Sequence, residues 1–188
     1  LAAGNYCTFN NFDEFRKASG TGRSDVQLQM RNAGSNAIVR SEVGLLAFPV
    51  SFVQSNGATE LAGGNLFGAS FDIRGGILKG AGLIMGDVTN GGEIQPGIGA
   101  GVLTVSNASP QTYTTTTNGK IVLQIGGLNP ETGHDVLAVK GNAILAGTLR
   151  AELPSGFLPT TGNAFTVMTY SARSGLITNY EFPNYTFD

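Results

Sequence analysis

Residues 75–107 read GGILKGAGLIMGDVTNGGEIQPGIGAGVLTVSN, and this stretch decides the fold class. Single or paired aliphatic residues recur in it, mostly every five or six positions, with Gly, Asn and Asp between them. These aliphatic positions are Ile77, Leu83, Val88, Ile94 and Val102. Each apolar group is too short for an independent strand of about five or six residues. Short strands become stable when they stack as the coils of a solenoid with Gly or Asn at the corners, so we predict an all-β solenoid.

Apolar residues that alternate with polar ones predict further strands on both sides of this stretch. We expect these strands at residues 44–53, 120–125, 145–153 and 165–170. In the segment LAGTLRAEL, Leu145, Leu149 and Leu153 fall on one face, and we expect them to line the interior. Pro49 suits a bend or an edge of the first strand.

Residues 11–19 carry the signals of a short helix. Asn11 is a suitable N-cap, acidic residues follow in the first turn, basic residues occupy the last turn, and Gly20 can end the helix. Phe12 and Phe15 lie three positions apart and would share one face of the helix. We therefore predict an N-terminal capping helix whose two rings cover an open end of the solenoid.

The composition is that of one domain of low charge. The chain has 188 residues, a net charge of −2, 13% charged residues and 28 glycines. We expect no nucleic-acid partner because no basic patch is present, and no membrane span because no apolar run approaches about 18 residues. Cys7 is the single cysteine, so an internal disulfide is excluded.

We divide this single domain into three parts. Residues 1–60 are expected to hold the cap and the first strands, residues 61–175 the solenoid coils, and residues 176–188 an aromatic C-terminal segment. The repeated pattern stops without an ending signal, so we expect the chain to be part of a longer protein.

Three segments resemble the repeats of bacterial autotransporter passengers and related secreted surface proteins. They are GGEIQPG, GVLTV and HDVLAVKGNAILAGTLRAELPSGFLPTTGNAFTVMTYSARSG. The resemblance covers about residues 75–175 and does not extend to residues 1–60. It implies a right-handed parallel β-helix that is secreted or displayed at the cell surface. These motifs specify a fold and carry little information about activity.

His134 is the single histidine of the chain and stands beside Asp135 in a loop that enters a strand. A catalytic dyad needs a nucleophile at a fixed place, and no spacing supplies one. We expect Asp135 to cap the turn by accepting backbone N–H groups, and His134 to be a rim residue without a catalytic role. The acidic residues are scattered and there is one histidine and one cysteine, so we predict no metal site and no cofactor.

The segment TYTTTTNG, residues 112–119, is rich in threonine. One interpretation is an exposed strand and turn with no further role. The other is a flat array of hydroxyl groups that binds sugars or ordered water. The residues of this possible polar face are Thr112, Tyr113, Thr114 and Thr116.

The C-terminal segment NYEFPNYTFD repeats the pattern Asn-Tyr-x-Phe. Its four rings belong to Tyr180, Phe182, Tyr185 and Phe187. We predict that these rings are largely buried, because so much apolar area is poorly tolerated in free solvent. They would form a cap on their own solenoid or a contact with a neighbouring copy. A third interpretation is an exposed platform on which sugar rings stack.

The sequence favours a structural or adhesive surface protein, such as an adhesin, a stalk or a filament subunit, over an enzyme. Its partners would be a polysaccharide or neighbouring copies of itself. A carbohydrate-binding module of β-helix type, attached to a secreted polysaccharide-degrading enzyme, is the alternative. A solenoid polysaccharide lyase or hydrolase is the third hypothesis, because stacking can bring carboxylates from distant coils together.

Overall fold

The computed structural model describes residues 6–106, 112–154 and 156–182, and these residues form strands and turns without a helix. The strands are β1 (Thr8–Asn11), β2 (Glu14–Lys17), β3 (Arg23–Asp25), β4 (Gln29–Asn32), β5 (Ile38–Ser41), β6 (Leu45–Phe48), β7 (Ser51–Gln54), β8 (Ala58–Ala62), β9 (Asn65–Ile73), β10 (Ile77–Asn90), β11 (Glu93–Pro96), β12 (Val102–Val105), β13 (Thr112–Thr115), β14 (Lys120–Gln124), β15 (Val136–Val139), β16 (Asn142–Leu145), β17 (Thr148–Glu152), β18 (Met168–Thr169), β19 (Ala172–Gly175) and β20 (Asn179–Glu181).

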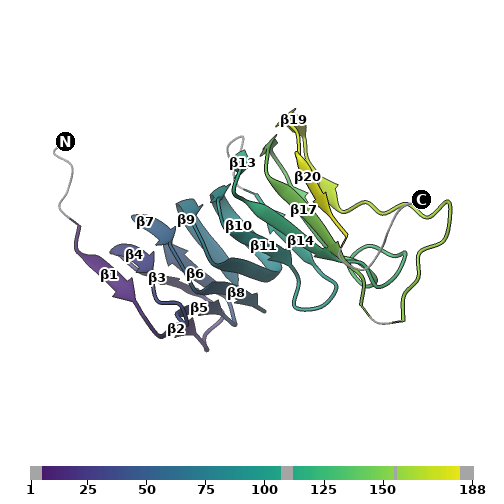
Figure 1. Cartoon of the computed structure of the whole chain (residues 1–188). Helices are drawn as coiled ribbons and strands as arrows, with labels where there is room; N and C mark the ends of the chain where they lie inside the picture. Colours follow the sequence, from purple (N-terminus) through teal and green to yellow (C-terminus); the bar gives the residue numbers. More distant parts are fainter. Residues whose placement is uncertain (1–5, 107–111, 155, 183–188) are drawn as a thin grey trace.

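The strands stack in parallel, and strands of successive coils lie side by side from one end of the molecule to the other (Figure 1). In the first coils each strand pairs with the one three places later, as β1 does with β4 and β4 with β7. The long strand β9 contributes to two of the rows of paired strands, and β10 contributes to three. This all-β arrangement of parallel strands is consistent with the β-solenoid that the spacing of aliphatic residues predicted.

Three rows of paired strands form three faces of the stack. The first face contains β1, β4, β7, the end of β9, the end of β10, β13, β16 and β19. The second face contains β2, β5, β8, the start of β10, β11, β14, β17 and β20. The third face contains β3, β6, the start of β9, the middle of β10, β12, β15 and β18.

The core is a set of aliphatic rows that run from coil to coil. On the second face Leu78 pairs with Ile94, Ile94 with Ile121, and Ile121 with Leu149. The first three of these side chains are at most 1% exposed. Burial of each such side chain contributes about 1.5–3 kcal/mol to stability. Of the strand predicted at residues 120–125, β14 covers Lys120–Gln124, and Ile121, Val122, Leu123 and the following Ile125 are all buried.

Buried amide side chains line the corner that follows the first face. Asn11 pairs with Asn32, and Asn32 pairs with Gln54, in adjacent coils. The Asn11 Nδ2 donates to Asn32 Oδ1 at 2.9 Å, and the Asn32 Nδ2 donates to Gln54 Oε1 at 3.2 Å and to the Ala58 carbonyl at 2.9 Å. This amide row satisfies backbone carbonyls that the corner removes from the sheet, which is the condition for burying them.

The predicted N-terminal helix is wrong, because residues 8–17 form the strands β1 and β2. Asn11 does not cap a helix; its side chain starts the amide row and donates to the carbonyls of Asp13 and Ile38. Phe12 stands at the corner between the two strands and is 69% exposed, whereas Phe15 packs against the core. The two rings therefore do not share a face, and among the described residues β1, β2 and β3 pair only with strands of the next coil.

The predicted single strand at residues 145–153 is also wrong, because a corner divides it into β16 and β17. Gly147 forms that corner with a φ of 72°, and a Cβ there would collide with the Gly119 carbonyl of the coil before it. The inward direction of Leu145 is confirmed, and Leu149 is partly buried against the core. The strand predicted at residues 165–170 is reduced to Met168–Thr169.

Candidate functional sites on the outer faces and at the C-terminal end

The outer surface of the second face carries ion pairs that run across the coils. Arg40 Nε lies 2.8 Å from Glu60 Oε2, and Lys79 Nζ lies 2.9 Å from Glu60 Oε1. Burial favours a higher pKa for Glu60, but hydrogen bonds and charges from Lys79 and Arg40 outweigh it and hold the pKa below its usual range. Glu60 is therefore an ionised link between three coils, and Arg40 and Lys79 balance its charge.

His134 and Asp135 are both buried, so the prediction that His134 lies at the rim is wrong. The His134 Nδ1 lies 3.1 Å from the Gly127 carbonyl, and its ring meets the Phe165 ring edge-on at 5.4 Å between centroids. Its Nε2 is buried, with no hydrogen-bond partner among the described residues. His134 thus packs the base of the loop at residues 126–133.

The predicted turn-capping role of Asp135 is confirmed by its hydrogen bonds. One carboxylate oxygen accepts the Gln124 N–H at 2.8 Å and the other accepts the Gly101 N–H at 3.0 Å. Burial raises the pKa of Asp135 to about 6, although the two backbone N–H groups and His134 act in the opposite direction. Asp135 therefore ties the start of β15 to two other segments of the stack.

The outer surface of the third face is largely apolar. Its outward side chains include the partly exposed Leu45, Phe67, Leu83, Met85 and Val102, and the buried Val136 and Ala138. A hollow of about 340 Å³ lies at the C-terminal part of this face, which we call the third-face groove. The sequence did not predict this groove. Its lining residues are Val102, Thr104, Pro130, Glu131, Val136, Ala138, Lys140, Thr166 and Thr169.

The first face holds the predicted threonine array, but only in part. Tyr113 points inward and is fully buried, so it does not belong to a polar outer face. Its hydroxyl accepts from Thr115 Oγ1 at 2.8 Å, and burial raises the pKa of Tyr113 to about 12. Thr112 and Thr114 are partly exposed, and Thr112 lines a hollow of about 290 Å³ on this face. The other residues of that hollow are Asn142, Ile144, Ala172, Arg173 and Ser174.

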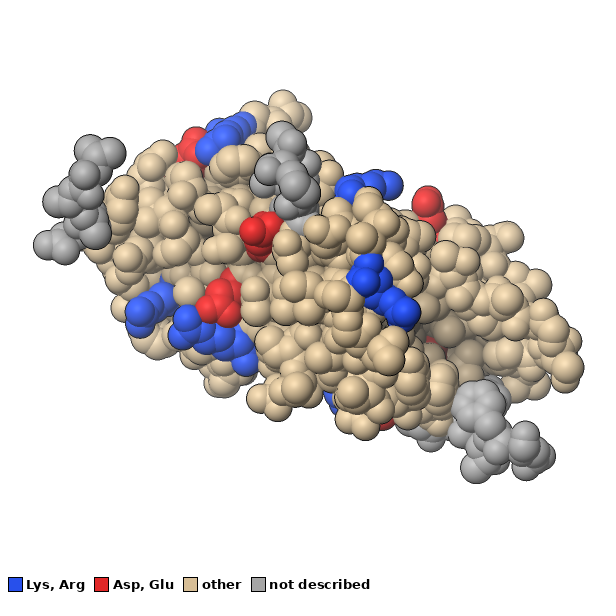
Figure 2. All heavy atoms as spheres, turned by 90° about the horizontal axis from the view of Figure 1, so that it is seen from above, with Lys and Arg blue, Asp and Glu red and all other residues tan. Residues whose placement is uncertain are grey.

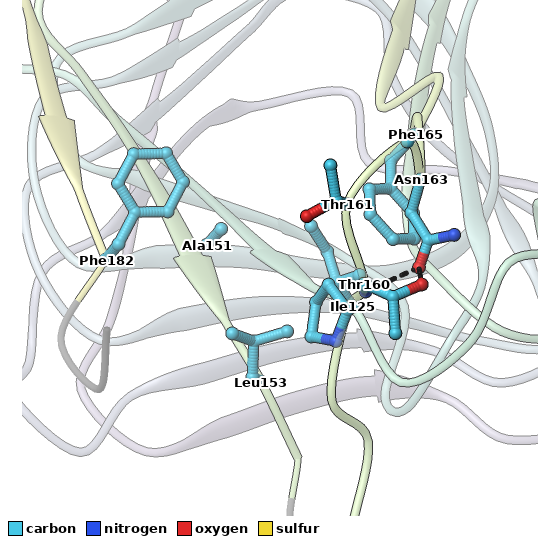
Figure 3. Close-up of a pocket in the computed structure, with 10 residues that line it drawn as sticks. Ile125, Ala151, Leu153, Thr160, Thr161, Asn163, Phe165 and Phe182 are labelled. Atoms are coloured by element: carbon cyan, nitrogen blue, oxygen red, sulfur yellow. Dashed lines mark hydrogen bonds between the residues drawn. The ribbon is translucent and has the colours of Figure 1, made fainter. Parts of the chain in front are cut away.

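A third cavity, of about 530 Å³, lies at the C-terminal end of the stack (Figure 3). Figure 3 shows Phe182 on one side of it, Phe165 with Thr160 and Thr161 on the other, and Ala151 and Leu153 between them. Ala151 of β17 is buried and Leu153, just after that strand, is partly buried, whereas Thr160, Thr161 and Asn163 on the other side of the cavity are exposed.

The aromatic C-terminal segment is only partly described. Tyr180 pairs with Leu149 on the second face and is 62% exposed, so its own solenoid does not bury it. Phe182 is partly buried at the terminal cavity. Tyr185 and Phe187 lie outside the described residues. Burial of Tyr180 against a neighbouring copy stays a prediction.

Charged side chains are sparse in the chain, at 13% of its residues. Figure 2 shows separate small groups of them on a surface formed mostly by uncharged residues. Within the described ranges, no group of three or more His, Cys, Asp or Glu side chains is placed to hold a metal ion. The same residues include no helix with the length and hydropathy of a membrane-spanning segment.

Comparisons with known proteins returned no matching family, no matching curated protein and no matching solved structure.

Proposed function

We propose that this protein is an extracellular structural or adhesive surface protein, such as a stalk, an adhesin or a filament subunit, and that it acts without catalysing a reaction. The observation that carries the proposal is that the buried polar side chains form bonds within the scaffold. The buried amides, Glu60 and Asp135 bind neighbouring coils and turns, as parts of the scaffold. A scaffold that must stay extended outside a cell needs such links between coils.

We also propose that the coils wind in a right-handed sense and that the protein is secreted or displayed at the cell surface. The handedness is supported by the general rule that connections between parallel strands of one sheet are right-handed. The location is supported by the motif resemblance over residues 75–175 and by the low share of charged residues, 13%.

Electron microscopy of the purified protein, combined with incubation on uronate and neutral polysaccharides, tests the structural role. The proposal predicts elongated particles or filaments and no cleavage products. Release of new reducing ends or unsaturated sugars by the protein would contradict it, and so would compact particles of irregular shape.

Carbohydrate binding is a second candidate function, and the hollow on the first face favours it. Thr112, Asn142 and Ser174 offer hydroxyl and amide groups around the exposed Ile144 side chain. Sugars present the matching combination of hydroxyl groups and C–H surfaces. A glycan array with the wild-type protein and an Asn142→Ala, Ser174→Ala variant tests it. Binding that the variant loses supports this function, and equal signals for both proteins contradict it.

A further inference from the structure

The two ends of the stack present strand edges on the same two faces. At the N-terminal end β1 and β2 pair with β4 and β5, and at the C-terminal end β19 and β20 pair with β16 and β17. Within residues 6–106, 112–154 and 156–182, each of these four terminal strands has a partner along one edge only. The other edge carries backbone N–H and C=O groups that can pair with a further parallel strand.

On the second face, one row of inward positions starts at Phe15 in β2 and finishes at Tyr180 in β20. The strand register joins these two residues through Val39, Thr59, Leu78, Ile94, Ile121 and Leu149. Phe15 is partly buried, and its ring lies 5.6 Å from that of Phe9 between centroids. Tyr180 is 62% exposed. A second copy stacked in the same register would place its Phe15 ring against Tyr180, and the contact would remove apolar surface of both rings from water.

On the first face, the corresponding row starts at Phe9 in β1 and finishes at Arg173 in β19. The positions between them are Met30, Phe52, Phe71, Val88, Tyr113 and Ala143. These six side chains are at most 1% exposed, whereas Phe9 and Arg173 are both exposed. The same continuation would place the Phe9 ring of a second copy beside the Arg173 guanidinium, a pair that forms a favourable cation–π contact.

The outward charges of the second face follow a pattern inside the stack. Glu60 has Arg40 as its register partner in the coil before it and Lys79 as its register partner in the coil after it. It forms an ion pair with each of them. A carboxylate between two cations of adjacent coils is therefore a link that this scaffold already uses.

At the C-terminal end the same pattern is half complete. Glu181 has Arg150 as its register partner, and its carboxylate lies 3.0 Å from Lys120 Nζ. Arg16 and Glu181 stand one position after the two rings that end the inward row, so a second copy in the same register would bring its Arg16 next to Glu181. Both side chains are partly exposed, and the ion pairs of Arg16 within its own chain are 3.8 Å or longer. The two ends of the stack therefore carry opposite charges at matching positions.

We propose that the C-terminal end binds the N-terminal end of a second copy of this chain, with β1 of the second copy parallel to β19 and its β2 parallel to β20. This contact rests on the proposed role as a filament subunit and specifies the partner and the register. The continued rows on two faces and the opposite charges of Arg16 and Glu181 favour a second copy as the occupant. Because the interface joins two different ends, every added copy presents the same end again and the assembly grows into a filament.

Disulfide capture tests the register of this contact. The outward row of the first face starts at Asn10 and finishes at Ser174, and both side chains are exposed. Asn10→Cys and Ser174→Cys are introduced together in a Cys7→Ser background, which removes the single native thiol. Across the proposed contact the two positions lie about 4.8 Å apart between Cα atoms, a separation that a disulfide spans. Mild oxidation of the full chain is expected to give a ladder of covalent dimers, trimers and longer oligomers on a non-reducing gel.

Three control proteins in the same Cys7→Ser background separate the proposed contact from other encounters. Asn10→Cys alone and Ser174→Cys alone are each expected to stay monomeric, and covalent dimers of either one would show that like ends meet. Asn10→Cys combined with Thr89→Cys places the second thiol at an exposed position of the same row in the middle of the stack. It is expected to give at least about tenfold less oligomer. Dimers of a single-cysteine protein, or equal ladders from the two double variants, would overturn the proposal.

A charge variant tests the same contact without a covalent link. Arg16→Glu brings two carboxylates together at the junction, and self-association measured by sedimentation velocity is expected to weaken at least about fivefold. The matched control is Arg74→Glu, which reverses an exposed arginine between β9 and β10 and is expected to leave self-association unchanged. Equal melting temperatures of the two variants show that the fold is kept. An Arg16→Glu protein that assembles as well as wild type would overturn the contact. Wild-type particles that stay single, elongated and without cleavage activity would overturn it too, while the structural role would stand.

Discussion

Asn32 is the residue on which the amide row depends most. Its side chain accepts from Asn11 and donates to Gln54 and to the Ala58 carbonyl in the fully buried corner. Replacing Asn32 with Leu leaves these groups without partners, and we expect a loss of about 2–4 kcal/mol in the free energy of unfolding. Urea denaturation measures this loss. The matched control is Asn10→Leu, which changes an exposed amide of β1 and should shift stability by less than about 0.5 kcal/mol. Equal effects of the two substitutions would show that the amide row is not needed.

Asp135 makes stability depend on pH in a known direction. Its pKa in the folded protein is about 6, above the ordinary value of 3.8, so the folded state holds a proton that the unfolded state has released. This contribution is fully present below pH 4 and is lost as the pH rises through 6. Relative to an Asp135→Asn variant, the wild type should therefore lose about 3 kcal/mol between pH 4 and pH 7. Denaturation of both proteins across this range measures the difference. A difference that grows in favour of the wild type as pH rises would mean that the backbone N–H groups dominate.

At the residue scale, side-chain chemistry was predictable from the sequence where it is local. The turn role of Asp135 follows from a loop that enters a strand, and it was predicted correctly. Asn11 suits a helix N-cap and a solenoid corner equally well, since both need an amide beside unpaired backbone groups. The choice between them depends on Asn32 in the next coil, 21 residues away, which local pattern does not reveal.

At the element scale, the position of a strand in the stack determines how much the burial of its inward side chains contributes to stability. Leu123 in β14 is 1% exposed between two coils, whereas Leu149 in β17 is partly exposed below Tyr180. We expect Leu123→Ala to cost about 2–5 kcal/mol and Leu149→Ala about 1–2 kcal/mol, because the second site is less enclosed. Thermal or urea unfolding of the two variants checks the order. A larger loss for Leu149→Ala would mean that the terminal coil is better covered than the described residues indicate.

Ion pairs between strands provide a second test at this scale. Removing the charge in Glu60→Gln leaves Arg40 and Lys79 without their shared partner, and we expect a cost of about 1–3 kcal/mol. The control is Asp72→Asn, which breaks an exposed pair with Arg74 and should cost less than about 1 kcal/mol. The free energies of unfolding of the two variants and the wild type, measured at low salt and at 1 M salt, give both costs. Equal small effects would show that the cross-coil charges contribute nothing.

The positions where a strand begins and ends were less predictable than the side chains that it points inward. Alternation from Leu145 to Leu153 continues through the corner at Gly147, because a solenoid corner changes the direction of the chain while inward positions stay inward. The alternation therefore predicted correctly that Leu145 points inward, but it did not predict the position of the corner. The pattern of aliphatic groups in residues 75–107 was more informative, since the gaps between Ile77, Leu83 and Val88 mark where the chain passes from one face to the next, although β10 is one continuous strand.

At the scale of the whole molecule, the stacking of coils was predictable and the groove was not. The third-face groove joins residues that are distant in sequence, and it depends on the loop at residues 126–133 leaving the stack between β14 and β15. The number of residues per coil varies, as Phe71 pairs with Val88 while Tyr113 pairs with Ala143. Without a constant repeat, the sequence does not show which outward residues become neighbours.

Distances between spin labels along the first face test most directly the claim on which the rest depends, that the coils stack in parallel register. Arg31 is linked to Thr114, Ile144 and Ser174 by four, five and six register steps. With a spacing of about 4.8 Å per step, pulsed electron paramagnetic resonance on the three label pairs should give backbone separations of about 19, 24 and 29 Å. Narrow distributions that increase by about 5 Å per step would support the account. Distances that do not increase in this order would contradict it.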